Sequence, residues 1–446
     1  MTSSAPAALR APCRRLIAAL ACTVALLPTP GQGQTNTPTA TPGTARYSLK
    51  QLTSLALEYN RGLQAAADQV EAARAGIDTA RAFPNPELET VKGNLRARLP
   101  GTNEGDSRGV WITQRIDYPW VRSARIDAAD AAFDAARSEQ QLSRNELLAR
   151  LRYRFYELLR QEAELKAAQE DQTTMEQIAK RILLKVDTGE SPRFEAIKAD
   201  TELLNARKQV QSAELRIRQT RASLRQLVGT VLPAGFEVAG SLEDAATPPS
   251  LETLRTELIE RNPELARNRA LTRQAENLRD HERRQRWPAL AIKGGYDQTP
   301  DSRDSRVGLV LTVPIWDWRS GPVAEAEARL SKARNEEALQ EFTLQQILET
   351  AWQQWQIATA QVNALQSGIV KQAEAALKVA EAAYRYGERG ILEYLDAQRV
   401  YRAARNELIA ARFDQQVAII EIGRLRAPVA DMSPDTVGTE SKGNTP

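Results

Sequence analysis

Few side chains in this chain of 446 residues have types and spacings that could do chemistry. Two carboxylates near the C-terminal end, Glu393 and Asp396, are three residues apart and would share one face of a helix. Carboxylates grouped in this way hold cations, repel anions and raise one another's pKa. An ordinary solvated helix face has the same spacing, so the spacing alone leaves both interpretations open.

The other reactive residue types do not form a catalytic or metal-binding pattern. His281 is the only histidine and lies in a charged stretch, while Cys13 and Cys22 both fall in the N-terminal segment. Thiolate, imidazole and thioether ligands are therefore nearly missing from the rest of the chain. We expect no enzyme, no catalytic residue, no metal site and no cofactor.

The N-terminal segment has the three parts of an export signal. Arginines come first, an apolar run from Leu16 to Leu27 follows, and residues 28–33 are rich in proline and glycine. The run is too short to span a bilayer, so residues 1–34 are predicted to be a cleaved signal peptide. Lipidation of Cys22 is kept as an alternative.

Charge excludes a nucleic-acid partner. The formal net charge of +3 equals the three arginines of the predicted signal, and the remaining charges of both signs are interspersed as on a solvated helical surface. No apolar run long enough for a membrane helix follows the signal. A membrane crossing would therefore have to use strands.

The elements that position Glu393 and Asp396 occur twice along the chain. Residues 189–199 match residues 387–397 in one Gly, two Glu and one Ala at a fixed spacing of 198 residues, and Ala206-Arg207 matches Ala404-Arg405 at the same spacing. A duplication explains this best. We predict two repeats, 35–229 and 251–427, joined by a linker at 230–250 and followed by a disordered tail at 428–446.

Each repeat is predicted to contain three helices, at residues 47–82, 121–186 and 192–228 and again at 251–286, 321–386 and 390–426. The longest would reach about 100 Å. We expect helix 192–228 to stack end to end on helix 251–286, so that both run antiparallel to a long helix. An ordinary coiled coil is the alternative.

A hairpin is predicted between the first two helices of each repeat. Alternating apolar residues indicate strands near 290–296, 307–313 and 110–116, whereas the strand from Glu87 is weakly patterned. Four strands cannot close a barrel, so we expect a trimer whose chains share one barrel of twelve strands.

Five tryptophans lie in or beside the hairpins. They indicate either an aromatic girdle at the membrane surface or packing between sheet and helix: Trp111, Trp120, Trp287, Trp316 and Trp318.

Four segments resemble the TolC-type outer-membrane efflux proteins. They are Asn262–Leu265 (NPEL), Val313–Asp317 (VPIWD), Tyr384–Arg399 and Gln114–Arg122. The last is similar to the heavy-metal resistance (CzcC-like) branch, although that branch usually has glycine at the position of Trp120. The resemblance implies a mainly α fold: a trimeric periplasmic α-barrel joined to a shared 12-stranded outer-membrane β-barrel, with four strands from each chain.

The resemblance also implies roles for the matching residues. Glu393 and Asp396 would line the periplasmic aperture as acidic rings, whereas the first repeat has Lys198 where the second has Asp396. Tyr384 and Arg389 would form a latch that holds the aperture shut, with Glu195 as the acceptor for both. The glycines Gly189 and Gly387 would sit at the periplasmic tips where an adaptor docks.

We therefore expect an outer-membrane exit duct of a Gram-negative bacterium that extends into the periplasm and conducts heavy-metal cations passively. Its partners would be two further copies of the chain, outer-membrane lipid, a periplasmic adaptor and an inner-membrane RND-type transporter. One alternative is a multidrug or type I secretion outlet. The alternative from another class is a soluble periplasmic coiled-coil adaptor or scaffold.

Overall fold

The computed structural model of the protein describes residues 46–96, 100–101 and 103–426. The chain divides into two units, residues 1–43 and 44–446, and every described residue belongs to the second unit. The predicted signal peptide, with Cys13 and Cys22, and the predicted tail at 428–446 lie outside the described residues.

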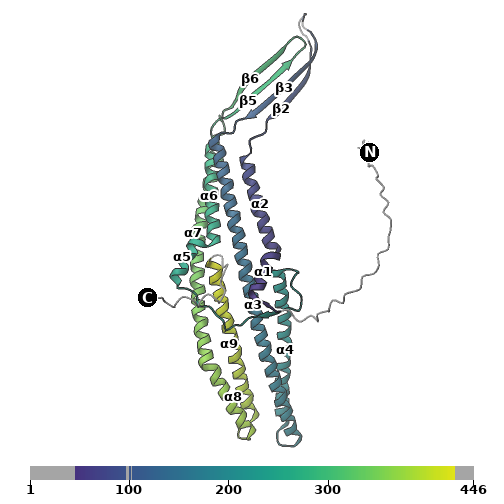
Figure 1. Ribbon diagram of the computed structural model, residues 1–446, viewed down its shortest axis with the longest axis vertical. Coiled ribbons are helices and arrows are strands. Elements are labelled where there is room, and N and C mark those ends of the chain that lie inside the picture. The colour runs from purple at the N-terminus through teal and green to yellow at the C-terminus, as the bar shows by residue number, and fades with distance from the viewer. Residues whose placement is uncertain (1–45, 97–99, 102, 427–446) are drawn as a thin grey trace, which may run out of the picture. The chain divides into compact units, whose positions relative to one another are not determined.

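The two predicted repeats appear as the same succession of elements (Figure 1). The first repeat consists of β1 (Arg46–Ser48), α1 (Leu49–Tyr59), α2 (Arg61–Arg81), β2 (Glu87–Leu95), β3 (Gly105–Arg115), α3 (Pro119–Asp187) and α4 (Arg193–Val228). The second consists of β4 (Glu237–Ala239), α5 (Leu251–Arg261), α6 (Pro263–Arg284), β5 (Ala289–Gln298), β6 (Arg303–Thr312), α7 (Ser320–Ala364), η1 (Leu365–Ile369), α8 (Val370–Arg385) and α9 (Ile391–Arg426).

Three of the predicted long helices are interrupted. The helices predicted at 47–82 and 251–286 break at Asn60 and Asn262, which have extended backbones and cap α2 and α6. Asparagine at such a position accepts hydrogen bonds from the first turn of the next helix, and this competes with continuing the previous one. The helix predicted at 321–386 contains one π-helical turn, η1. By contrast α3 runs unbroken for 69 residues, about 100 Å long.

The predicted stacking of helix 192–228 on helix 251–286 is wrong. The side chain of Asn60 donates to the carbonyl of Leu227 at 2.7 Å, so the end of α4 meets the α1–α2 junction of its own repeat. The second repeat has the matching bond, 3.0 Å from Asn262 to the carbonyl of Leu425 at the end of α9. In each repeat the end of the last helix therefore meets the junction of the first two helices. The side-chain NH2 of the capping asparagine can make this contact, because the last carbonyls of a helix have no partner within the helix.

The predicted linker at 230–250 carries a short strand that pairs in parallel with β1. Its apolar side chains Leu232 and Phe236 are buried against Phe155 and Leu158 of α3. Burying two large apolar side chains stabilises such a segment by several kcal/mol, about 1.5–3 for each. The segment is therefore part of the core around α3 and not a free connection.

The four predicted hairpin strands form one antiparallel sheet in the order β2-β3-β5-β6. Residues that face one another alternate between two faces. One face is apolar, with Leu88, Ile112, Gly294 and Val307 in register across the four strands. The next row, on the opposite face, is Glu89, Trp111, Gly295 and Arg306. This two-faced sheet lies at one end of the long helices, and the turns α3–α4 and α8–α9 lie at the other (Figure 1).

Among the described residues, none of the helices has an apolar stretch long enough to cross a membrane.

Candidate functional site

The turns at the far end of the helices are built alike in both repeats. Gly189 and Gly387 have φ of 79° and 75°, a left-handed conformation that glycine adopts without strain. The amide after each glycine bonds back into the helix, from Glu190 to the carbonyl of Lys185 at 2.8 Å and from Glu388 to that of Ala383 at 2.9 Å. A Cβ at either glycine would meet nothing within 4 Å. Backbone conformation, and not crowding, therefore requires glycine at both turns.

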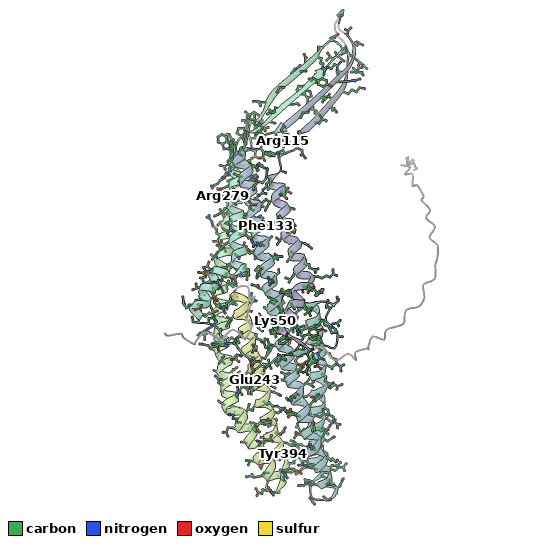
Figure 2. All side chains as sticks on the ribbon, viewed as in Figure 1. Lys50, Arg115, Phe133, Glu243, Arg279 and Tyr394 are labelled. Carbon is green, nitrogen blue, oxygen red and sulfur yellow. The ribbon has the colours of Figure 1, made fainter. Side chains whose placement is uncertain are left out.

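Tyr384 is buried beside the second of these turns. Its ring stacks on that of Tyr394 with centroids 5.9 Å apart, and the ammonium of Lys185 lies 4.9 Å from the ring centroid. Burial raises the pKa of Tyr384, and the nearby carboxylate of Glu195 raises it further. The hydroxyl is buried, yet no hydrogen-bond partner for it exists among the residues that the structure describes. Figure 2 shows the labelled Tyr394 near the end of the helices remote from the sheet.

The carboxylates Glu393 and Asp396 lie on the exposed face of α9, whereas Tyr394 and Leu395 between them are buried. Each carboxylate has its own cation: Arg389 contacts Glu393 at 3.2 Å, and Arg399 contacts Asp396. Both pairs lie within one chain and are more than half exposed. The groove beside them is lined mainly by alanine and other small or apolar side chains of α8 and α9, including Ala373, Ala376 and Val400.

The prediction that Glu195 is the acceptor for Arg389 is wrong within this chain. Arg389 bonds to Glu393, one helical turn away, because side chains at positions i and i+4 are neighbours on a helix. Glu195 acts on Tyr384 only through its charge. The structure thus brings Glu195 and Tyr384 close together but places Arg389 in a separate ion pair.

A buried ionic cluster between α3 and α9 was not among the predicted site residues. Asp171, with a side chain 6% exposed, accepts from Gln398 at 3.3 Å and lies 3.5 Å from Arg405. Arg405 also contacts Glu170 at 2.8 Å and the carbonyl of Ala167 at 2.7 Å. The available signal was the recurrence of arginine at positions 207 and 405, which are 198 residues apart like the two turns. In the first repeat Arg207 pairs with Glu176 at 3.3 Å.

The five predicted girdle tryptophans separate into two groups. Trp111 lies on the charged face of the sheet, where its indole N–H donates to Asp297 at 3.1 Å and Lys293 lies 5.2 Å from its ring. Because neighbouring residues of a strand point to opposite faces, Trp111 cannot belong to an apolar girdle formed by the other face. The remaining four lie where the strands connect to the helices and are exposed: Trp120, Trp287, Trp316 and Trp318.

Metal ligands do not gather anywhere in the part of the chain that the structure describes: no group of three or more His, Cys, Asp or Glu side chains could hold an ion. His281 instead lies 3.3 Å from the carbonyl of Val121 through Nδ1.

Comparison with known families decides the identity of this two-repeat architecture. The outer membrane efflux protein family matches residues 52–230 and again residues 254–425. The chain is an outer membrane efflux protein. The two matched segments coincide with the two structural repeats, and the gap between them coincides with the linker that carries β4.

Two of the most similar relatives of this efflux protein are named for metal resistance. The cobalt-zinc-cadmium resistance protein CzcC of Cupriavidus metallidurans is 28% identical over 360 residues, which cover 80% of this chain and 84% of the relative. The nickel-cobalt-cadmium resistance protein NccC of Alcaligenes xylosoxydans xylosoxydans is 27% identical over 303 residues, covering 65% and 67%.

Solved structures share the fold of this efflux protein. CusC superposes with a TM-score of 0.75 at 19% identity, covering 85% of this chain and 92% of that chain. The open-state outer membrane channel MtrE of Neisseria gonorrhoeae superposes with a TM-score of 0.71 at 17% identity, covering 85% and 88%. At such identities the likeness shows the fold alone, and the fold is the mainly α, TolC-like architecture that the sequence predicted.

The efflux protein is therefore a channel protein of the Gram-negative outer membrane that extends into the periplasm, and not an enzyme. The alternative of a soluble periplasmic adaptor is wrong. Resemblance to the heavy-metal resistance branch is confirmed by the metal-resistance relatives.

The two faces of the sheet predict different tolerance to charge in this outer membrane efflux protein. Leu309 is 70% exposed on the apolar face, and its neighbour Val310 points to the charged face. Replacing Leu309 with arginine should cost about 2–4 kcal/mol if that face meets lipid hydrocarbon. We expect L309R to fold poorly into vesicles and V310R to fold normally, as measured by heat-dependent migration. Equal behaviour of the two variants would contradict lipid contact by the apolar face.

Proposed function

We propose that this outer membrane efflux protein is the exit duct of a three-part efflux system and conducts divalent metal cations passively to the exterior. The similarity to CzcC along 80% of the chain is the observation that carries the proposal. The exposed acidic pair Glu393 and Asp396 supports it, because grouped carboxylates attract cations and repel anions.

The duct would be a homotrimer. Strands β2 and β6 are the edges of the four-stranded sheet, and the apolar face between them is exposed in one chain. Unpaired strand edges are not tolerated in lipid, and four strands are too few to close around a lumen. Three chains would join β6 of one to β2 of the next in one twelve-stranded barrel. The long helices would continue the tunnel into the periplasm.

The helix turns at Gly189 and Gly387 would be the docking points for a periplasmic adaptor. Both lie at the end of the helices remote from the sheet, and their backbones have the same left-handed cap. Two similar turns in each of three chains would offer six nearly equivalent positions. The adaptor would connect the duct to an inner-membrane RND-type transporter, which supplies the energy.

A deletion strain tests the cargo. Loss of the gene should sensitise the cells to zinc, cobalt or cadmium, and a plasmid copy should restore growth in the presence of the metal. Sensitivity to drugs without sensitivity to any metal would contradict metal export and favour a multidrug outlet. Loss of a secreted protein instead would favour a type I secretion outlet.

The acidic pair should control ion selectivity. Replacing Glu393 with glutamine and Asp396 with asparagine removes up to six charges from the proposed trimer, so cation preference should fall strongly in planar bilayers. Reversal potentials under a salt gradient measure that preference. The control is Glu325→Gln: Glu325 is also exposed and paired with an arginine one turn away, but it lies on α7 near the sheet. Equal selectivity of wild type and the double variant would contradict the acidic ring.

A further inference from the structure

Where the helices meet the sheet lies a group of arginines that form no ion pair with a carboxylate of the described residues. Within that part of the chain, Arg284 donates to the carbonyl of Trp120 at 2.6 Å and the hydroxyl of Ser123 at 3.1 Å. Arg122 donates to the carbonyl of Arg81 at 2.6 Å. The side chain of Arg286 lies exposed just beyond α6 and forms no hydrogen bond or ion pair among the described residues, although its charge acts on Glu327 at longer range.

The carboxylates of the same region are already paired with other arginines. Asp117 lies 2.7 Å from Arg125, and Glu327 lies 2.6 Å from Arg283. The remaining two pairs are Asp280 with Arg279 at 2.8 Å and Glu282 with Arg319. Figure 2 shows the labelled Arg115 and Arg279 at this sheet end of the helices. Arg122, Arg284 and Arg286 therefore form no direct ion pair within the described chain, and the carboxylate nearest to Arg286, Glu327, is already paired with Arg283.

Exposed aromatic rings surround these arginines. The rings of Trp120 and Trp287 meet edge to face with centroids 6.3 Å apart, and Arg122 lies 4.3 Å from the centroid of Phe83. Phe83 is 66% exposed and Trp287 is 65% exposed. Aromatic side chains of this kind belong at the boundary between hydrocarbon and headgroups, where one part of the ring is in an apolar environment and another is hydrated.

We propose that Phe83, Trp120, Arg122, Arg284, Arg286 and Trp287, here called the junction patch, bind the headgroup of an anionic phospholipid in the inner leaflet of the outer membrane. The sheet belongs to the membrane and the helices to the periplasm, so the junction patch lies at the depth of the inner-leaflet headgroups. Guanidinium groups form charge-assisted hydrogen bonds with phosphate oxygens. The tryptophan and phenylalanine rings would contact the glycerol and upper acyl chains.

Charge and exposure together favour a lipid over a free anion. Inorganic phosphate could use the arginines but would leave the exposed surfaces of the three rings in water. One lipid molecule satisfies both, because its phosphate and its acyl chains are joined. The site would hold the duct at a fixed depth, independently of which cargo it conducts.

Native mass spectrometry of the purified protein with equimolar phosphatidylglycerol and phosphatidylethanolamine tests the site. Wild type should retain more phosphatidylglycerol than phosphatidylethanolamine. The double variant Arg122→Gln/Arg286→Gln should bind it more weakly, by about fivefold for each arginine removed. Trp287→Ala should weaken binding of both lipids, because the ring contacts the parts that the lipids share.

The control variant Arg216→Gln/Arg218→Gln removes two exposed arginines of α4 that also lack described partners. It should bind phosphatidylglycerol as wild type does. If the double variant at the junction patch does not fold, Arg286→Gln alone serves, since that side chain forms no hydrogen bond or ion pair among the described residues. Equal binding of the two lipids by wild type, or equal loss in the α4 control, would overturn the proposal. Displacement of the lipid by millimolar inorganic phosphate would overturn it in favour of a free-anion site.

Discussion

Replacing Tyr384 with phenylalanine and Arg389 with glutamine in the same chain should raise the single-channel conductance in planar bilayers severalfold. Y384F removes only the hydroxyl and keeps the ring stacked on Tyr394. R389Q removes the charge that contacts Glu393 at 3.2 Å. Both changes are expected to weaken the closed state of the proposed aperture while leaving the packing of the helices intact.

The state of the Tyr384 hydroxyl is the reason for this expectation. It is buried without a partner among the described residues of a single chain, and leaving such a group unsatisfied costs about 1–3 kcal/mol. We propose that the closed state of the trimer gives this hydroxyl an acceptor, and Glu195, whose charge already raises the pKa of Tyr384, is the candidate. Losing about 2 kcal/mol from the closed state would shift the closed-to-open equilibrium roughly thirtyfold.

Two adjacent residues provide a matched control for the latch. Tyr386 is 82% exposed and Arg385 is exposed beside it, so Y386F/R385Q changes the same residue types without touching a buried group. The control should conduct like wild type. Unchanged conductance in Y384F/R389Q, or an equal increase in the control, would show that Tyr384 and Arg389 do not hold the aperture shut.

Replacing Arg405 with alanine should destabilise the protein by about 3 kcal/mol, because removing one partner leaves the charge of buried Asp171 uncompensated. The side chain of Arg405 is only 19% exposed and joins α9 to α3 through Asp171, Glu170 and the carbonyl of Ala167. Thermal unfolding followed by circular dichroism measures the loss. The comparison is Arg207→Ala in the first repeat, whose pair with Glu176 is about half exposed and should be worth less than about 1 kcal/mol.

A double-mutant cycle with Asp171→Asn separates charge from packing. The variant D171N/R405A should recover part of the stability lost in R405A, because asparagine carries no charge and its side chain can still bond to Gln398. No recovery would mean that Arg405 acts through its contacts with Glu170 and Ala167 alone.

The pH dependence of stability gives the same cluster a second readout. Burial raises the pKa of Asp171, and the nearby Arg405 partly opposes that rise. The folded chain therefore binds the Asp171 proton more tightly than the unfolded chain does. The contribution of this proton to the free energy of unfolding is complete below the pKa of aspartate in the unfolded chain, about 4. That contribution is lost as the pH rises through the pKa of Asp171 in the folded chain. Wild type should lose stability relative to D171N over that interval.

Local signals in the sequence predicted most of the elements. Helix α3 has no proline or glycine after its first turn and carries an apolar stripe, so its predicted bounds of 121–186 agree closely with Pro119–Asp187. The turns at Gly189 and Gly387 were expected from the repeat, and the observed positive φ explains why glycine stands there. Strand β2 was weakly patterned because its apolar residues Leu88, Val91 and Leu95 do not keep the spacing of two that alternation requires.

Interactions between distant segments could not be predicted in the same way. Asn60 interrupts a helix and bonds to the carbonyl of Leu227, and the partner decides which helix ends meet. The pairing of Arg389 with Glu393 instead of Glu195 depends on which carboxylate lies within reach once the turn has formed. The sequence does not distinguish Trp111 from the other four tryptophans of the hairpins. Only the strand register places it on the charged face of the sheet.

The sequence by itself determined the duplication, the export signal as an expectation, the long helices, the left-handed turns and the membership of the TolC-type family. These depend on periodicity, composition and backbone conformation, which act over a few residues or repeat along the chain. The tertiary structure alone decided that each repeat stacks on its own first helix, that Asp171 is buried beside Arg405, and that unpaired arginines gather at the sheet. Those features depend on contacts between residues far apart in sequence, and the free energy of such contacts depends on burial and distance.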